Sequence, residues 1–193
     1  MSLSNTSPQH AHVIPGVLRR ATGALGRALT RNGAEAAGRP PLAAGERILR
    51  TGLDDGGRAV VGTNHALYHQ RTDVWLRWGW ELVHRVDWDA DRRTLTLWAV
   101  GRDVPGRTAL RLPAGDRLAW FACERVSAQT VIDTHVRPGD GRLVRVIARR
   151  RPGSDELLWI VTRPGAHPGA AVDAEQDDHV TAAITRIRRE LGV

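Results

Sequence analysis

Three histidines come nearest to a metal site in residue type and spacing. His65 and His69 lie four positions apart and would share one face of a strand, with His84 as a third nitrogen ligand for zinc. A strand rises about 3.3 Å per residue, so the two rings would stand about 13 Å apart. A zinc ion bonded to each nitrogen at about 2 Å cannot span that distance. We therefore predict no metal site and interpret these histidines as scattered polar residues.

Other catalytic and cofactor motifs are missing from the sequence. The alternating acids Asp87, Asp89 and Asp91 lack the glycine and the final glutamate of a calcium loop, which favours a solvated turn. The chain has no lysine for a phosphate-binding loop and no Gly-x-Ser-x-Gly elbow. We therefore predict no catalytic residue and no cofactor. A small-molecule-binding barrel or enzyme stays open as a second alternative.

The basic residues are all arginine, and they give the chain a formal net charge of +7. Because a GC-rich genome also favours arginine, glycine and alanine, the charge alone is weak evidence for a nucleic-acid or membrane partner. One hairpin nevertheless concentrates arginines into a tip that is able to meet phosphates. Three interpretations stay open: a solvated edge, contact with an anionic membrane or a partner, and nucleic-acid binding. The candidate anion or partner contacts are Arg142, Arg145, Arg149, Arg150 and Arg151.

A second basic segment lies near the N-terminus, inside residues 1–41, which we interpret as a mobile tail, a short helix and a linker. From Pro15 onward the apolar residues fall on one helical stripe, with arginines on the opposite side. Gly23 and Gly26 each cost about 1 kcal/mol, so the helix should form only against its own domain, a partner or a membrane surface. The candidate contact residues are Val17, Leu18, Arg20, Leu25, Arg27, Leu29 and Arg31.

Seven tryptophans stand beside one tyrosine and one phenylalanine. Between residues 74 and 88 the apolar side chains alternate, which predicts one strand, or two strands bent at Gly79, with one face buried. Trp78, Trp80 and Trp88 share that face and are assigned to the core. Trp75 points the other way, so it is a candidate anchor for a partner.

The remaining patterns predict an α+β fold in which residues 42–193 form a single globular domain. Turn residues recur about every 8–12 positions and predict short strands over 46–112. Helical periodicity predicts a helix over 115–129, an antiparallel meander follows over 131–163, and an amphipathic helix spans 173–191. A single cysteine, Cys123, excludes an internal disulfide and is typical of a reducing compartment. No secretory signal or long apolar run is visible, so we expect a cytoplasmic protein.

Several short motifs resemble one known family. They are Glu46-Arg-Ile-Leu, the corner Gly62-Thr-Asn-His-Ala-Leu-Tyr68, Trp80-Glu-Leu-Val-His84, Val86-Asp-Trp88 and Glu124-Arg-Val126. Residues 42–165 resemble an uncharacterised family of high-GC Gram-positive bacteria (actinobacteria) with a pleckstrin-homology-like (PH-like) plan. The resemblance implies an antiparallel β-barrel or sandwich plugged by a helix, used mainly for binding, and it transfers no catalytic residue.

Lipid-binding members of the wider PH-like class use basic residues in the first hairpin loop. Here residues 51–58 carry two acids against one arginine, so we expect no phosphoinositide recognition through this loop. The sequence as a whole predicts a non-enzymatic binding module that acts as an adaptor or as a peripheral membrane-associated module, and its favoured partner is a protein. An anionic membrane surface is a further partner, and nucleic-acid binding through residues 142–151 is the alternative.

Overall fold

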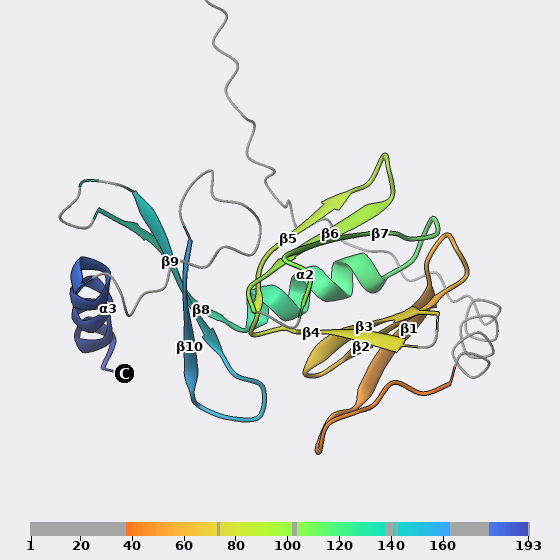
Figure 1. Ribbon diagram of the computed structural model, residues 1–193, viewed down its shortest axis with the longest axis horizontal. Helices are drawn as coiled ribbons and strands as arrows, with labels where there is room; N and C mark the ends of the chain where they lie inside the picture. The colour runs from red at the N-terminus through yellow and green to blue at the C-terminus, as the bar shows by residue number, and fades with distance from the viewer. Residues whose placement is uncertain are drawn as a thin grey trace, which may run out of the picture.

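The computed structural model describes residues 38–72, 74–101, 104–137, 141, 143–162 and 178–192. Within these ranges the chain is α+β, with ten strands in three antiparallel sheets and two helices (Figure 1). No helix in these ranges combines the length and the apolar character needed to cross a membrane. The predicted N-terminal helix, residues 17–31, lies outside the described residues.

The first sheet is a meander of β1 (Ile48–Leu53), β2 (Ala59–Thr63), β3 (Ala66–Arg71) and β4 (Val74–Gly79), paired in that order. Of its two middle strands, β2 is buried along its whole length and β3 is buried from Ala66 to His69, so both faces of the sheet are covered there. The β1–β2 connection is a tight turn that places Gly57 at a φ of 75°, where a residue without Cβ is favoured.

The second sheet consists of β5 (Val83–Asp89), β6 (Thr94–Ala99) and β7 (Arg107–Arg111), also paired in chain order. The alternating stretch 74–88 is therefore two strands, β4 and β5, in two different sheets. Trp80 forms the corner between them: its backbone N–H donates to the carbonyl of His65, and its indole Nε1 donates to the carbonyl of Thr63. These two hydrogen bonds hold the corner against the β2–β3 connection.

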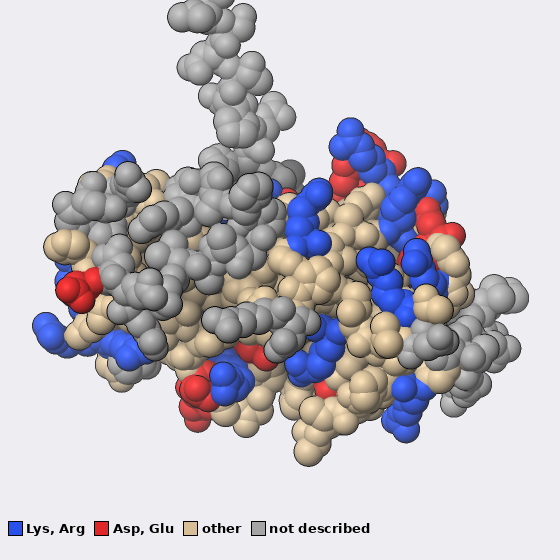
Figure 2. Space-filling view, in the orientation of Figure 1, with Lys and Arg blue, Asp and Glu red and all other residues tan. Residues whose placement is uncertain are grey.

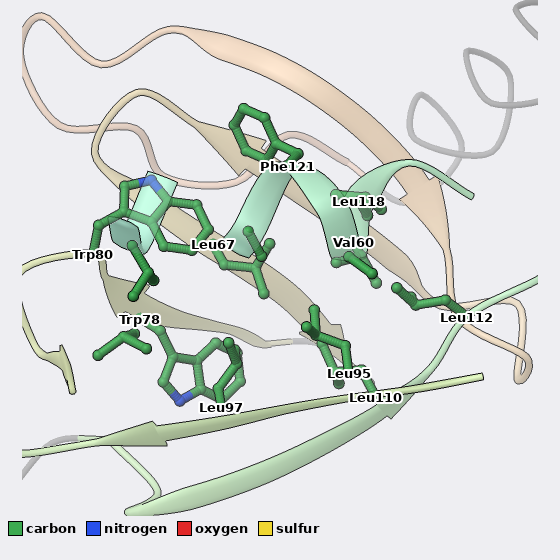
Figure 3. Packing of buried hydrophobic residues seen from close by; sticks show 14 of the residues in the cluster. Val60, Leu67, Trp78, Trp80, Leu95, Leu97, Leu110, Leu112, Leu118 and Phe121 are labelled. Carbon is green, nitrogen blue, oxygen red and sulfur yellow. The ribbon is translucent and has the colours of Figure 1, made fainter. Parts of the chain in front are cut away.

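Helix α2 (Leu118–Ala128) fills the space between the first and second sheets (Figure 1). The helix begins where Asp116 Oδ1 accepts a hydrogen bond from the Leu118 N–H at 2.7 Å. Gly62 on β2 faces Phe121, whose ring leaves no space for a Cβ at that position. Residues from both sheets and from α2 share one apolar core (Figure 3), which includes Val60, Leu67, Trp78, Trp80, Leu95, Leu97, Leu110, Leu112, Leu118 and Phe121.

The third sheet contains β8 (Thr130–Val136), β9 (Val144–Arg150) and β10 (Leu157–Thr162), in the order β10-β9-β8. Helix α3 (Asp178–Leu191) covers one face, where Val180 and Ile184 join the apolar cluster of β9 and β10. The other face packs against the second sheet's connections. The residues in that contact are Ile147, Ile160 and Leu158 from the third sheet, with Leu82 and Val100.

The predicted α+β class with antiparallel strands is confirmed, but the barrel does not close. Among the described residues, no ladder joins β4 to β5 or β1 to β7, so the three sheets stay separate. The physical reason is the corner at Trp80, which turns the chain out of the first sheet, together with the bulk of α2 between the sheets. Packed side chains therefore hold the first two sheets together where a barrel would use backbone hydrogen bonds.

Candidate functional site

The arginines of the predicted basic hairpin do not form a free basic surface. Arg145 donates two hydrogen bonds to Asp133, from Nε at 2.7 Å and from Nη2 at 2.6 Å. Two further pairs of the same hairpin are exposed: Arg150 with Asp155 at 2.6 Å and Arg151 with Glu156 at 2.9 Å. Arg142 lies outside the described residues. Each of these three described arginines is therefore already paired with an acidic side chain of the third sheet or of its β9–β10 turn.

Arg149, the next member of the predicted set, is buried, with 2% of its surface exposed. Its Nη1 donates to the carbonyl oxygen of Val126 at 2.5 Å and to Thr130 Oγ1 at 2.7 Å. Burial lowers the pKa of Arg149 to about 10, so the side chain stays charged at neutral pH. This arginine therefore anchors the third sheet to the end of α2 and is not available to a ligand at the surface.

The other predicted contact residues are placed as follows. Trp75 is half-buried on the outer face of the first sheet, where its ring stands edge-on to Tyr68 at a centroid distance of 6.5 Å. The helix candidates between Val17 and Arg31 lie outside the described residues. His69 and His84 belong to different sheets, and no cluster of three metal-ligating side chains is found in the described part of the chain.

A pocket lies beneath the β1–β2 turn, with a volume of about 350 Å³, and is called the turn pocket below. Its walls come from that turn, from the end of β3 and from β7. Figure 2 shows acidic and arginine atoms gathered on the side of the molecule where Figure 1 places β1, β7 and the tip of β5 and β6. The charged and polar lining residues are Asp54, Asp55, Arg58, His69, Arg71 and Arg111.

Asp54 organises the turn above the pocket. Its Oδ1 accepts hydrogen bonds from the backbone N–H groups of Gly56 at 2.8 Å and Arg58 at 2.9 Å. Its Oδ2 accepts from Arg58 Nε at 3.0 Å and from His69 Nε2 at 2.9 Å. Burial by itself raises the pKa of Asp54, but these hydrogen bonds outweigh burial and hold the pKa below its usual value. The carboxylate is therefore ionised and fully engaged with donors of its own chain.

His69 serves as a neutral donor that fixes Asp54. An ionised carboxylate only accepts, so Nε2 must carry the proton in this contact. Burial lowers the pKa of His69, the hydrogen bond to Asp54 opposes that effect, and the charges of Arg58 and Arg71 lower the pKa further. The opposite nitrogen, Nδ1, is buried and has no hydrogen-bond partner among the described residues. A proton at Nδ1 would thus be a buried donor without an acceptor, which favours the neutral ring.

The second acid of the turn, Asp55, is neutralised from the second sheet. Its carboxylate lies 3.3 Å from Arg93 Nη2 and 3.5 Å from Arg111 Nε, and its backbone N–H donates to the Arg111 carbonyl at 2.9 Å. Arg71, at the end of β3, makes no ion pair with a described residue. Four arginines therefore surround two carboxylates, and the turn pocket and its rim carry an excess of positive charge.

In the folded protein, the surroundings of the β1–β2 turn are more positively charged than residues 51–58 alone suggest. The sequence stretch contains two acids and one arginine, but Arg71, Arg93 and Arg111 reach it from strand ends and turns far along the chain. The signal that sequence reasoning missed is an arginine at the last position of both β3 and β7. This pattern predicts a basic site only when the strand order is known, because the strand order places the ends of β3 and β7 beside the β1–β2 turn.

The arrangement suits binding of an anionic group. A guanidinium group offers planar, charge-assisted donors that match phosphate and carboxylate oxygens. The lining residues include no serine, threonine, cysteine, tyrosine or lysine that would act as a nucleophile beside His69. Comparison with protein-family models, with curated proteins and with solved structures found no match for this chain.

Proposed function

We propose that this chain is a binding module that takes a small anionic ligand, carrying a phosphate or carboxylate group, in the turn pocket. The observation that carries the proposal is the charge balance, because both acids at the pocket already have donors and Arg71 has no ion pair among the described residues. An incoming anion would offset part or all of this excess positive charge. The pocket volume lies at the small end of the range for small-molecule sites.

The order of the elements supports a second part of the proposal, that residues 48–128 follow a PH-like plan. A four-stranded meander, a three-stranded meander and a helix packed between them succeed one another along the chain. On this view β8 to β10 and α3 are an addition to the PH-like part. The PH-like plan is used mainly for binding, which agrees with a ligand site at a strand-connecting turn.

The other proposed partners rest on less of the described structure. Nucleic-acid binding through residues 142–151 would have to compete with the pairs that Arg145, Arg150 and Arg151 make with their own acids. The membrane and protein-partner proposals rest on the same hairpin, on residues 17–31, which are outside the described ranges, and on Trp75, which is half-buried against Tyr68. The turn pocket is the anion site that the described geometry supports best.

The test is calorimetric titration of the full chain with inorganic phosphate, pyrophosphate and citrate at low ionic strength. We expect Arg71→Gln to weaken binding of the best of these ligands at least about tenfold, the value of one lost charge-assisted hydrogen bond. Arg50→Gln is the matched control, because Arg50 is exposed on β1 outside the pocket and the variant loses the same charge. Equal loss in both variants would show non-specific attraction to a basic protein and would refute the proposal.

A further inference from the structure

The second sheet carries different side chains on its two faces. Helix α2 packs on the face that bears Leu95, Leu97 and Leu110 (Figure 1). The alternate residues of the same strands form the opposite face, which is called the outer face below. Its rows of facing residues are Arg85–Trp98–Arg107, Asp87–Thr96–Ala109 and Asp89–Thr94–Arg111. The outer face therefore combines one tryptophan with three arginines.

Trp98 lies between two guanidinium groups of the outer face. The guanidinium carbon of Arg85, on β5, lies 4.5 Å from the centre of the Trp98 ring, and that of Arg107, on β7, lies 5.7 Å from it. Arg85 is also paired with Asp87, whereas Arg107 is exposed and makes no ion pair with a described residue. A partly exposed ring beside arginines offers the stacking surface and the charge that unpaired nucleotides require.

The turn pocket adjoins the outer face along β7. Ala109 and Arg111 line the pocket, and together with Arg107 they occupy the alternate, exposed positions of β7. A strand rises about 3.4 Å per residue, so Arg107 and Arg111 lie about 14 Å apart. A stacked strand of nucleic acid rises about 3.4 Å per nucleotide, so this interval corresponds to about four nucleotides. The small side chain of Ala109 leaves the space between the two arginines open.

We propose that the phosphate group in the turn pocket belongs to a short single strand of nucleic acid, which continues along β7 past Arg107 and stacks a base at Trp98. The proposal rests on the proposed function, because the turn pocket holds one end of this path. A single strand fits better than a duplex, because the bases of a duplex are stacked inside it and cannot reach a ring on a sheet face. The acids of the outer face, Asp87 and Asp89, lie on β5, away from this path, and each is paired with an arginine.

The test is a fluorescence anisotropy titration of labelled oligodeoxythymidine, about ten nucleotides long, with the full chain. We expect this oligonucleotide to bind at least about tenfold more tightly than pyrophosphate, which reaches the turn pocket alone. Arg107→Gln should weaken oligonucleotide binding at least about fivefold and should leave pyrophosphate binding unchanged, because Arg107 lies outside the pocket. Arg50→Gln is the matched control, because it removes the same charge from an exposed position on β1.

Two variants of Trp98 test the stacked base. Trp98→Phe keeps an aromatic face and should keep most of the affinity for the oligonucleotide. Trp98→Leu removes the aromatic face and should weaken oligonucleotide binding at least about fivefold, with pyrophosphate binding unchanged. Equal affinities of the two variants for the oligonucleotide would show that no base stacks on this ring and would overturn the proposal.

The outcomes separate this inference from the proposed function. Pyrophosphate binding without tighter oligonucleotide binding would overturn the inference and leave the proposed function standing. Equal weakening by Arg107→Gln and Arg50→Gln, or equally tight binding of a duplex of the same length, would show non-specific attraction and would also overturn the inference. Oligonucleotide binding that Arg71→Gln leaves unchanged would exclude the turn pocket from the path, with the same consequence. Binding of neither ligand would overturn both proposals.

Discussion

The guanidinium of Arg149, on the middle strand of the third sheet, donates to the carbonyl oxygen of Val126, in the last turn of α2, at 2.5 Å. The last carbonyls of a helix have no partner inside the helix, and a positive charge is favoured at that end. Thr130 Oγ1 donates to the same carbonyl at 2.8 Å. The contact therefore connects the third sheet to the helix that fills the core of the other two.

This contact predicts very different effects for two neighbouring arginines. Arg149→Ala removes the buried donor and leaves a cavity, so we expect the free energy of unfolding to fall by about 2–4 kcal/mol. Arg150→Ala removes an exposed pair with Asp155 and should change it by less than about 1 kcal/mol. Urea denaturation followed by tryptophan fluorescence measures both. Similar losses in the two variants would contradict the anchoring role of Arg149.

The close approach of α2 to β2 predicts that Gly62 cannot be replaced without cost. A Cβ at Gly62 would overlap the ring of Phe121, so we expect Gly62→Ala to lower the free energy of unfolding by about 1–3 kcal/mol. Phe121→Leu removes the ring atoms that clash. In the Gly62→Ala background, Phe121→Leu should therefore lower the free energy of unfolding clearly less than it does in the unmodified chain. Additive effects of the two substitutions, measured by thermal unfolding, would refute this packing relationship.

Glu46 is buried and accepts several hydrogen bonds. It is also the first residue of the short motifs quoted in the sequence analysis. It accepts from Thr63 Oγ1 at 2.5 Å, from Tyr68 OH at 2.8 Å and from the backbone N–H of Ala43 at 2.9 Å. Tyr68→Phe leaves one carboxylate oxygen with a donor fewer, and we expect a loss of about 1–3 kcal/mol. A double-mutant cycle with Glu46→Ala, which removes both acceptor oxygens, should show coupling between the two positions. Strict additivity would contradict a direct interaction.

The buried histidines predict a loss of stability in weak acid. Burial, with the charges of Arg145, Arg149 and Arg85, lowers the pKa of His84 to about 4, and burial also lowers the pKa of His69. The unfolded chain binds these protons near pH 6.5, so it holds more protons than the folded chain below that pH. The stabilising contribution of His84 is therefore complete above about pH 7 and is lost as the pH falls from about 6.5 to about 4.

The measurement is chemical denaturation of the full chain at a series of pH values. His84→Gln cannot titrate, and its free energy of unfolding should vary less with pH in this window than that of the unmodified chain. His135→Gln is the control, because His135 is exposed on β8 and the variant makes the same substitution outside the buried site of His84. An unchanged slope in His84→Gln would show that His84 is not the group responsible.

Local patterns determined much of the fold before any tertiary contact was known. Recurring turn residues predicted the short strands of residues 46–112, with alternating side chains over 74–88, and helical spacing predicted a helix over 115–129, where the structure has α2 from Leu118 to Ala128. Turn residues separated β8, β9 and β10 into a meander. These features follow from periods of 2.0 and 3.6 residues and from the backbone preferences of turn residues, which are properties of neighbouring residues along the chain.

Only the tertiary structure decided which charged residues from distant parts of the sequence come into contact. The sequence gives no reason for Arg149 to be buried at the end of α2, or for Arg71, Arg93 and Arg111 to gather around the acids of the β1–β2 turn. Strand alternation predicts which face a side chain occupies, but the order of strands and the packing of sheets decide which strand ends share a neighbourhood. The free energy of a charge depends on burial and on neighbours within a few ångströms, and for these arginines the neighbours are distant in the sequence.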